Sequence, residues 1–154
     1  MENTEYQRDL EKLIDILPPK IAWSVKEKKR ENIVEVVLDL GRFPEIRYLD
    51  GHVEQISKNR VVQEDLDFTV SKIDKFTDDN RSGIPGTLHR ISAIKNRKGT
   101  VIGLTCRIGR VVTGTIDSIR DLIALGKSIL FLGRPGIGKT TKLREITRLL
   151  ADEM

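Results

Sequence analysis

The chain has 154 residues, of which 38% are hydrophobic and 32% charged, values that are ordinary for a globular protein. No apolar run approaches the 18 or more residues of a membrane span, and the single cysteine, Cys106, excludes an internal disulfide. The net charge of +4 permits contact with nucleic acid but does not by itself indicate it.

Hydrophobic periodicity predicts two helices at the start of the chain, over residues 4–17 and 20–30. Pro18 and Pro19 separate them, since proline ends one helix and is tolerated in the first turn of the next. The second helix closes with five charged residues, 26–30, four of them basic. This basic end is either a nucleic-acid patch or a solvated helix terminus, where cations suit the helix dipole.

The middle of the chain alternates between strand and helix patterns. The dipeptide Asp50-Gly51 favours a hairpin turn, and residues 77–86 are rich in turn formers and predict a loop. Residues 96–99 close a second hairpin. The predicted strands are 33–40, 45–49, 53–57, 87–95 and 100–108, and the predicted helix is 63–76.

The last third of the chain begins with a predicted linker, 109–114, and a helix, 115–125. A short apolar run, 128–132, predicts a buried parallel strand. A further helix follows residue 140, because Leu143, Ile146 and Leu150 recur at helical spacing.

The motif G-x-x-x-x-G-K-T lies between that strand and helix, and it is the phosphate-binding Walker A pattern. Its glycines allow backbone N–H groups to approach phosphate oxygens, while the lysine supplies a charge and the threonine hydroxyl a ligand for Mg²⁺. The alternative is a plain turn between strand and helix. The predicted ligands are ATP and Mg²⁺, with Thr140 on the metal. The predicted site comprises Gly133, Arg134, Pro135, Gly136, Ile137, Gly138, Lys139, Thr140 and Thr141.

A working P-loop ATPase also needs further parallel strands, a second carboxylate for Mg²⁺ and a group that positions water. Fourteen residues follow Thr140, and they complete one helix without a Walker B strand. The sequence is therefore expected to be the front part of a longer protein and to be inactive as an ATPase by itself. The alternative is that another chain supplies the missing parts.

The order of elements resembles the amino-terminal portion of secretion and pilus-retraction ATPases. It is more closely similar to stage III sporulation protein AA and to the hypothetical chloroplast open reading frame 45 family. The similarity runs from about residue 10 to the end of the chain. The residues that carry it are Leu38-x-Leu40-Gly41-x-x-Pro44-x-Ile46-Arg47-x-x-x-Gly51, Arg90-Ile91-Ser92-Ala93, Ile16-Leu17-Pro18-Pro19, and the stretch from Arg107-Ile108-Gly109-Arg110 to Thr141.

This resemblance implies an α/β protein: an α+β domain followed by the first βα unit of a RecA-like P-loop domain. The expected divisions are 1–31, 32–112 and 113–154. The resemblance also implies a plastid location, with the bacterial cytoplasm as the alternative, and a homo-oligomeric ring in the full-length protein. Arginines of the small domain approach the nucleotide in such ATPases, which singles out Arg90 and Arg107. The alternative is that both are surface residues of strands, paired with nearby carboxylates. The rival interpretations are a regulatory nucleotide-binding module and a protein associated with single-stranded nucleic acid.

Overall fold

A computed structural model describes residues 2–28, 32–109, 114–134 and 137–152. The chain divides into two compact units, Met1–Arg110 and Val111–Met154. It combines helices with an antiparallel sheet, and the predicted α/β class is confirmed.

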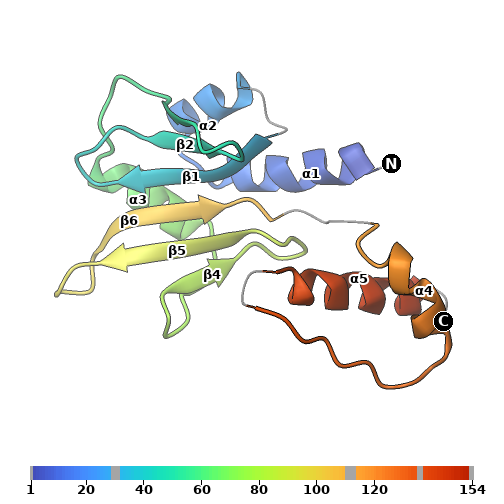
Figure 1. The fold of residues 1–154 in the computed structure, drawn as a ribbon. Helices are drawn as coiled ribbons and strands as arrows, with labels where there is room; N and C mark the ends of the chain where they lie inside the picture. The colour runs from blue at the N-terminus through green and yellow to red at the C-terminus, as the bar shows by residue number, and fades with distance from the viewer. Residues whose placement is uncertain (1, 29–31, 110–113, 135–136, 153–154) are drawn as a thin grey trace. The chain divides into compact units, whose positions relative to one another are not determined.

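The first unit is a six-stranded antiparallel sheet with the strand order β3-β2-β1-β6-β5-β4 (Figure 1). Its central strands pair in register, with Val36 opposite both Ile46 and Cys106, and Cys106 opposite Ile91. The strands are β1 (Ile33–Asp39), β2 (Glu45–Tyr48), β3 (Val53–Gln55), β4 (Arg81–Gly83), β5 (Arg90–Lys95) and β6 (Val101–Arg107).

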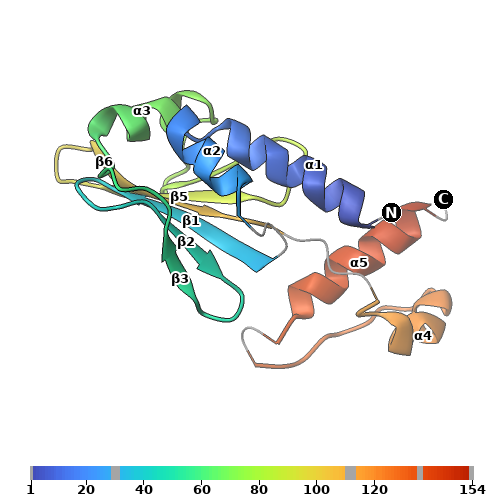
Figure 2. The same ribbon diagram turned by 90° about the horizontal axis from the view of Figure 1, so that it is seen from above.

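Three helices, α1 (Glu2–Asp15), α2 (Pro19–Lys26) and α3 (Gln63–Ser71), cover one face of this sheet (Figure 2). Leu10, Leu13 and Ile14 of α1 are fully buried and share one hydrophobic core with the sheet. Burial of this apolar stripe is the main term that fixes the helices, at roughly 1.5–3 kcal/mol for each large side chain. The opposite face of the sheet carries Glu35, Arg47, Arg90 and Arg107, which are register partners of one another.

Several predictions in this unit need correction. The helix predicted over 20–30 ends at Lys26, and the strand predicted over 87–95 begins at Arg90. The loop predicted over 77–86 contains a short strand, β4, which pairs with β5 although its sequence, Arg-Ser-Gly, has no apolar alternation. The helix predicted over 63–76 ends at Ser71. After it, Phe76 packs against the core from outside any helix.

The second unit contains a 3₁₀ turn, Asp117–Ile119, the helix α4 (Arg120–Ala124) and the long helix α5 (Lys139–Asp152). The helix predicted over 115–125 therefore forms only in part. The predicted strand 128–132 is wrong: these residues have no secondary structure. A strand needs hydrogen-bonded neighbours, and no described segment pairs with this one. Within the described ranges, no helix is long and apolar enough to cross a bilayer.

Candidate functional site

The predicted phosphate-binding motif leads directly into α5. Gly138 has a φ of +93°, a left-handed conformation that L side chains rarely adopt. Its carbonyl accepts the backbone N–H of Lys142 at 3.0 Å, which closes the first turn of the helix. Residues 135 and 136 of the predicted site lie outside the described residues. The glycine at 138 thus provides the sharp turn that places a helix N-terminus at the end of the loop.

Lys139 is the first residue of α5, and its ammonium folds back over the loop. It donates hydrogen bonds to the carbonyl oxygens of Gly133 and Arg134, both at 2.8 Å. Thr140 is exposed and Thr141 half-buried in the same first turn. Backbone N–H groups in a first turn have no partner within their helix, so the turn offers donors, a dipole and a cation to an anion.

The only support for the predicted magnesium site among the described residues is the hydroxyl group of Thr140. Among the described residues no group of three or more His, Cys, Asp or Glu side chains is placed to hold a metal ion. The Thr140 hydroxyl is the protein ligand that the motif offers, and phosphate oxygens and water would complete the shell in such a site.

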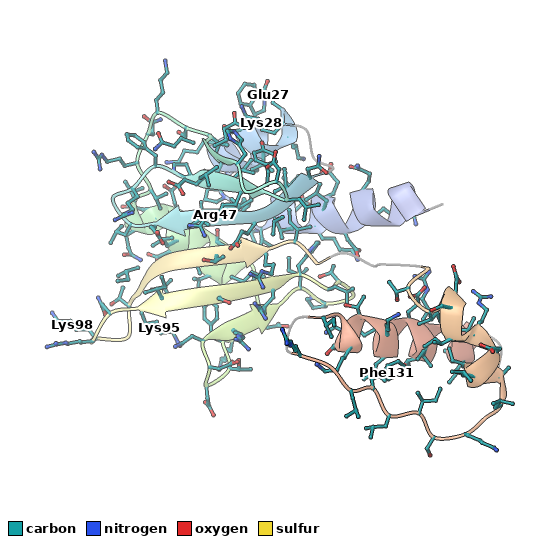
Figure 3. All side chains as sticks on the ribbon, viewed as in Figure 1. Glu27, Lys28, Arg47, Lys95, Lys98 and Phe131 are labelled. Carbon is teal, nitrogen blue, oxygen red and sulfur yellow. The ribbon has the colours of Figure 1, made fainter. Side chains whose placement is uncertain are left out.

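A second cluster lies on the open face of the sheet. Arg47, Glu35, Arg107 and Arg90 occupy one row across β2, β1, β6 and β5, each opposite the next. Figure 3 shows Arg47 on this face. Glu35 and Arg107 form an ion pair with 3.8 Å between the carboxylate and guanidinium atoms, and the buried Nε of Arg90 has no hydrogen-bond partner.

Both arginines singled out from the sequence therefore lie side by side, whereas Arg47 and Glu35 were missed. The alternating pattern of each strand indicates which residues share a face. It does not give the register between strands that are far apart in the sequence, and the row exists only through that register.

The basic end of the second predicted helix is largely neutralised where it is described. Lys26 pairs with Glu11 at 3.3 Å, and Lys28 pairs with Glu54 at 2.6 Å. Residues 29 and 30 lie outside the described residues. The described lysines support a solvated, paired helix end rather than a nucleic-acid patch.

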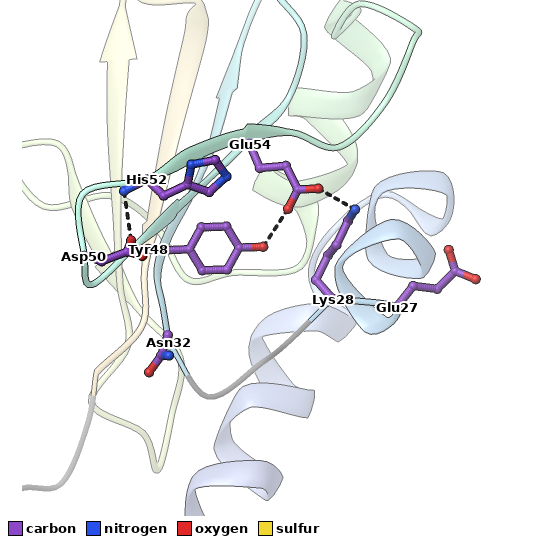
Figure 4. A pocket seen from close by; sticks show the side chains of 7 residues that line it. All are labelled: Glu27, Lys28, Asn32, Tyr48, Asp50, His52 and Glu54. Carbon is purple, nitrogen blue, oxygen red and sulfur yellow. Dashed lines mark hydrogen bonds and ion pairs between the residues drawn. The ribbon is translucent and has the colours of Figure 1, made fainter.

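The Lys28–Glu54 pair belongs to a surface hollow of about 480 Å³ (Figure 4). The Tyr48 hydroxyl donates to the other oxygen of Glu54 at 2.8 Å, and the Tyr48 ring stacks on His52. Burial and the Glu54 carboxylate raise the pKa of Tyr48 to about 12, while the hydrogen bonds from Lys28 and Tyr48 lower the pKa of Glu54. These groups are already paired with one another. The contacts among Lys28, Glu54 and Tyr48 link the β2–β3 hairpin to the residues that follow α2.

Comparison with known proteins relates the chain to plastid proteins. It is 54% identical over 147 residues to the uncharacterized protein ycf45 of Porphyra purpurea and 44% identical over 147 residues to that of Cyanidium caldarium. It is 55% identical over 146 residues to SEEDLING PLASTID DEVELOPMENT 1 of Arabidopsis thaliana. The matches cover 94–95% of this chain but only 26%, 44% and 21% of the respective relatives. No family model matches the chain.

Two solved structures share its fold. The Legionella pneumophila ATPase DotB aligns with a TM-score of 0.55 over 82% of this chain and 40% of its own. The pilus retraction motor PilT, solved with bound ADP, aligns with a TM-score of 0.59 over 82% of this chain and 41% of its own. Sequence identities of 15% and 16% limit both likenesses to the fold. The chain is thus homologous to the ycf45 and SEEDLING PLASTID DEVELOPMENT 1 proteins, which confirms the plastid location, and it shares its fold with parts of DotB and PilT.

Proposed function

We propose that this chain is the ATP-binding portion of a RecA-like P-loop ATPase of plastids. The observation that supports this most directly is the sequence of a left-handed Gly138, then Lys139, then the first turn of α5. The phosphates are held by Gly133 to Thr140, with Thr141 in the same helical turn, and Mg²⁺ is held by Thr140.

The chemistry of binding follows from charge. Lys139 donates to two neutral carbonyls in this structure, and a phosphate offers it an anionic acceptor, which makes a hydrogen bond roughly twice as strong. Free N–H groups of the first turn of α5 add to this attraction. The site binds triphosphate by its charge and geometry and does not itself contain a base.

The second part of the proposal concerns the row of Arg47, Glu35, Arg107 and Arg90 on the open face of the sheet, here called the arginine row. Three guanidinium groups share it with one carboxylate, so its net charge is positive. We infer that Arg90 and Arg107 face a nucleotide bound by a neighbouring subunit of a homo-oligomer and offset the charge of its γ-phosphate. The ion pair between Arg107 and Glu35 would hold the Arg107 guanidinium in place on the sheet.

Equilibrium binding of a fluorescent ATP analogue with Mg²⁺ tests the site. Lys139→Ala removes a charge-assisted hydrogen bond worth about 1.5–3 kcal/mol, so affinity is expected to fall about 10- to 150-fold. Gly138→Val, which forces a β-branched residue into the left-handed region, is expected to abolish binding while the circular-dichroism spectrum remains near that of the wild type.

The matched control is Lys98→Ala, at the exposed tip of the β5–β6 hairpin in the other unit (Figure 3). It removes the same charge and should leave affinity unchanged. Equal losses in Lys139→Ala and Lys98→Ala would show non-specific electrostatic binding. Unchanged affinity in Lys139→Ala would overturn the site, and competition with GTP and an oligonucleotide would measure its selectivity.

A further inference from the structure

A carboxylate on α5 holds the start of the second unit. Glu145 accepts hydrogen bonds from the backbone N–H groups of Gly114 and Thr115, the latter at 2.9 Å, and from the Thr115 hydroxyl. Lys142, one turn earlier, donates to the Thr115 carbonyl. The hydrogen bond from the Thr115 hydroxyl, followed by those from the backbone, lowers the pKa of Glu145, so this group is a carboxylate at neutral pH. Two side chains of α5, Glu145 and Lys142, thus form hydrogen bonds to the short segment Gly114–Thr115.

Apolar packing in this unit is slight. Among its described residues, Ile116 and Ile123 are the buried hydrophobic side chains, with 1% and 7% exposure. On α5, Leu143 and Leu150 are 48% and 44% exposed. Since little hydrophobic surface attaches α5 to the segment before it, the polar contacts of Glu145 and Lys142 provide much of the attachment.

The hydrogen bonds of Glu145 join the helix of the predicted phosphate site to the start of the second unit. Glu145 lies six residues after Lys139, about 9 Å along a helix, so both belong to one rigid element. Gly114 and Thr115 are the first described residues after the boundary between the two units at residues 110 and 111. The helix that begins at the phosphate loop is therefore attached at the point where the chain enters the second unit.

We propose that Glu145, assisted by Lys142, is a positioning residue that couples the phosphate-binding turn of α5 to Gly114 and Thr115, near the start of the second unit. The inference rests on the proposed nucleotide site. A phosphate draws Lys139 away from the carbonyls of Gly133 and Arg134, α5 shifts as one body, and Glu145 transmits the shift to Gly114 and Thr115. A purely structural role predicts the same contacts with no response to nucleotide.

Hydrogen exchange on the 154-residue chain, with and without a non-hydrolysable ATP analogue and Mg²⁺, tests the coupling. The amides of Gly114 and Thr115 donate to Glu145, so their exchange reports the contact directly. We expect saturating nucleotide to change their exchange rates by about threefold or more in the wild type. Glu145→Gln should bind nucleotide and lose this response.

Thr115→Val and Thr147→Val are a matched pair for the same experiment. The first removes a hydroxyl that donates to Glu145, and the second removes one that donates to Leu143 within α5 itself. The response should weaken in Thr115→Val and persist in Thr147→Val. If Glu145→Gln fails to fold, this pair decides.

The outcomes separate the two proposals. Lysine-dependent binding with unchanged exchange at Gly114 and Thr115 overturns the coupling and leaves the nucleotide site standing. A full response in Glu145→Gln also overturns it. Absence of Lys139-dependent binding overturns the proposed function and, with it, the coupling.

Discussion

Arg90 and Arg107 lie directly opposite each other on the neighbouring antiparallel strands β5 and β6. Like charges in this arrangement destabilise a sheet, by up to about 1 kcal/mol. Glu35 pairs with Arg107, and no hydrogen bond or ion pair within the described chain satisfies the Nε of Arg90. A pair that costs stability is more readily explained by binding an anion than by holding the sheet together.

This imbalance predicts opposite effects on stability for one substitution at the two positions. Arg90→Gln relieves the repulsion and should leave the free energy of unfolding unchanged or raise it by about 0.5 kcal/mol. Arg107→Gln also relieves it but deprives Glu35, whose side chain is 14% exposed, of its cation, and should lower stability by about 0.5–1 kcal/mol. Urea unfolding at neutral pH measures both. A loss above about 1 kcal/mol in Arg90→Gln would make that arginine a structural residue.

Under the proposed function, Arg90→Ala and Arg107→Ala in the complete ATPase are expected to lower the rate of ATP hydrolysis more than the affinity for ATP. Removing a cation that acts mainly on transition-state charge reduces kcat, whereas uniform binding would change KM. Arg97→Ala, on the exposed tip of the β5–β6 hairpin, is the control. Wild-type kcat in both variants would leave the row without a catalytic role.

The sequence predicted what is local. The β-branched run 33–40 and the Asp50-Gly51 turn between the runs 45–49 and 53–57 located β1, β2 and β3. The contiguous motif located Lys139 at the start of α5. The sequence-based prediction failed where pairing between strands determines the structure. The apolar run 128–132 has strand composition but no partner strand, and β4 is a strand because it lies beside β5. The arginine row and the Glu145–Thr115 contact are missed for the same reason: each joins residues distant in sequence.

Two glycines should respond differently to alanine. A Cβ on Gly109 would overlap the backbone carbonyl of Leu88, which cannot move without displacing the chain. A Cβ on Gly103 would meet the Asp39 carboxylate at 2.6 Å, at the end of a flexible side chain. We expect Gly109→Ala to cost about 2–4 kcal/mol and Gly103→Ala about 1 kcal/mol or less, measured by urea unfolding. Equal costs would mean that the close approach of Gly109 to Leu88 relaxes freely.

The segment before the predicted phosphate loop should promote self-association. Leu130 and Leu132 are 81% and 84% exposed, and their backbone has no partner strand among the described residues (Figure 3 shows the neighbouring Phe131). Exposed apolar side chains beside unpaired backbone groups favour contact with another chain. Leu130→Lys and Leu132→Lys should lower the weight-average mass that sedimentation equilibrium measures at high protein concentration. Leu49→Lys, which changes an exposed leucine of the β2–β3 turn, should not.

His89 connects three parts of the first unit. It is 4% exposed, its Nδ1 accepts the Gly109 N–H at 3.0 Å, and its Nε2 lies 2.7 Å from the Asp9 carbonyl of α1. A carbonyl only accepts, so the single proton of the neutral ring is on Nε2. If Nδ1 were protonated, its N–H would face the N–H of Gly109, and neither donor could accept a hydrogen bond from the other. Burial lowers the pKa of His89, while the neighbouring Asp9 acts in the opposite direction and Lys12 adds to the lowering.

This environment predicts that the protein loses stability in mild acid. The folded pKa lies below the value of about 6.5 in the unfolded chain, so the unfolded state takes up the proton first. The free energy of unfolding should therefore fall as pH drops below about 7, and level off once the folded pKa is passed. Urea unfolding between pH 7.5 and 5 measures the slope. His89→Gln should flatten it, whereas His52→Gln, which replaces the other, exposed histidine, should not. If both variants keep the wild-type slope, groups other than His89 cause the loss of stability in acid.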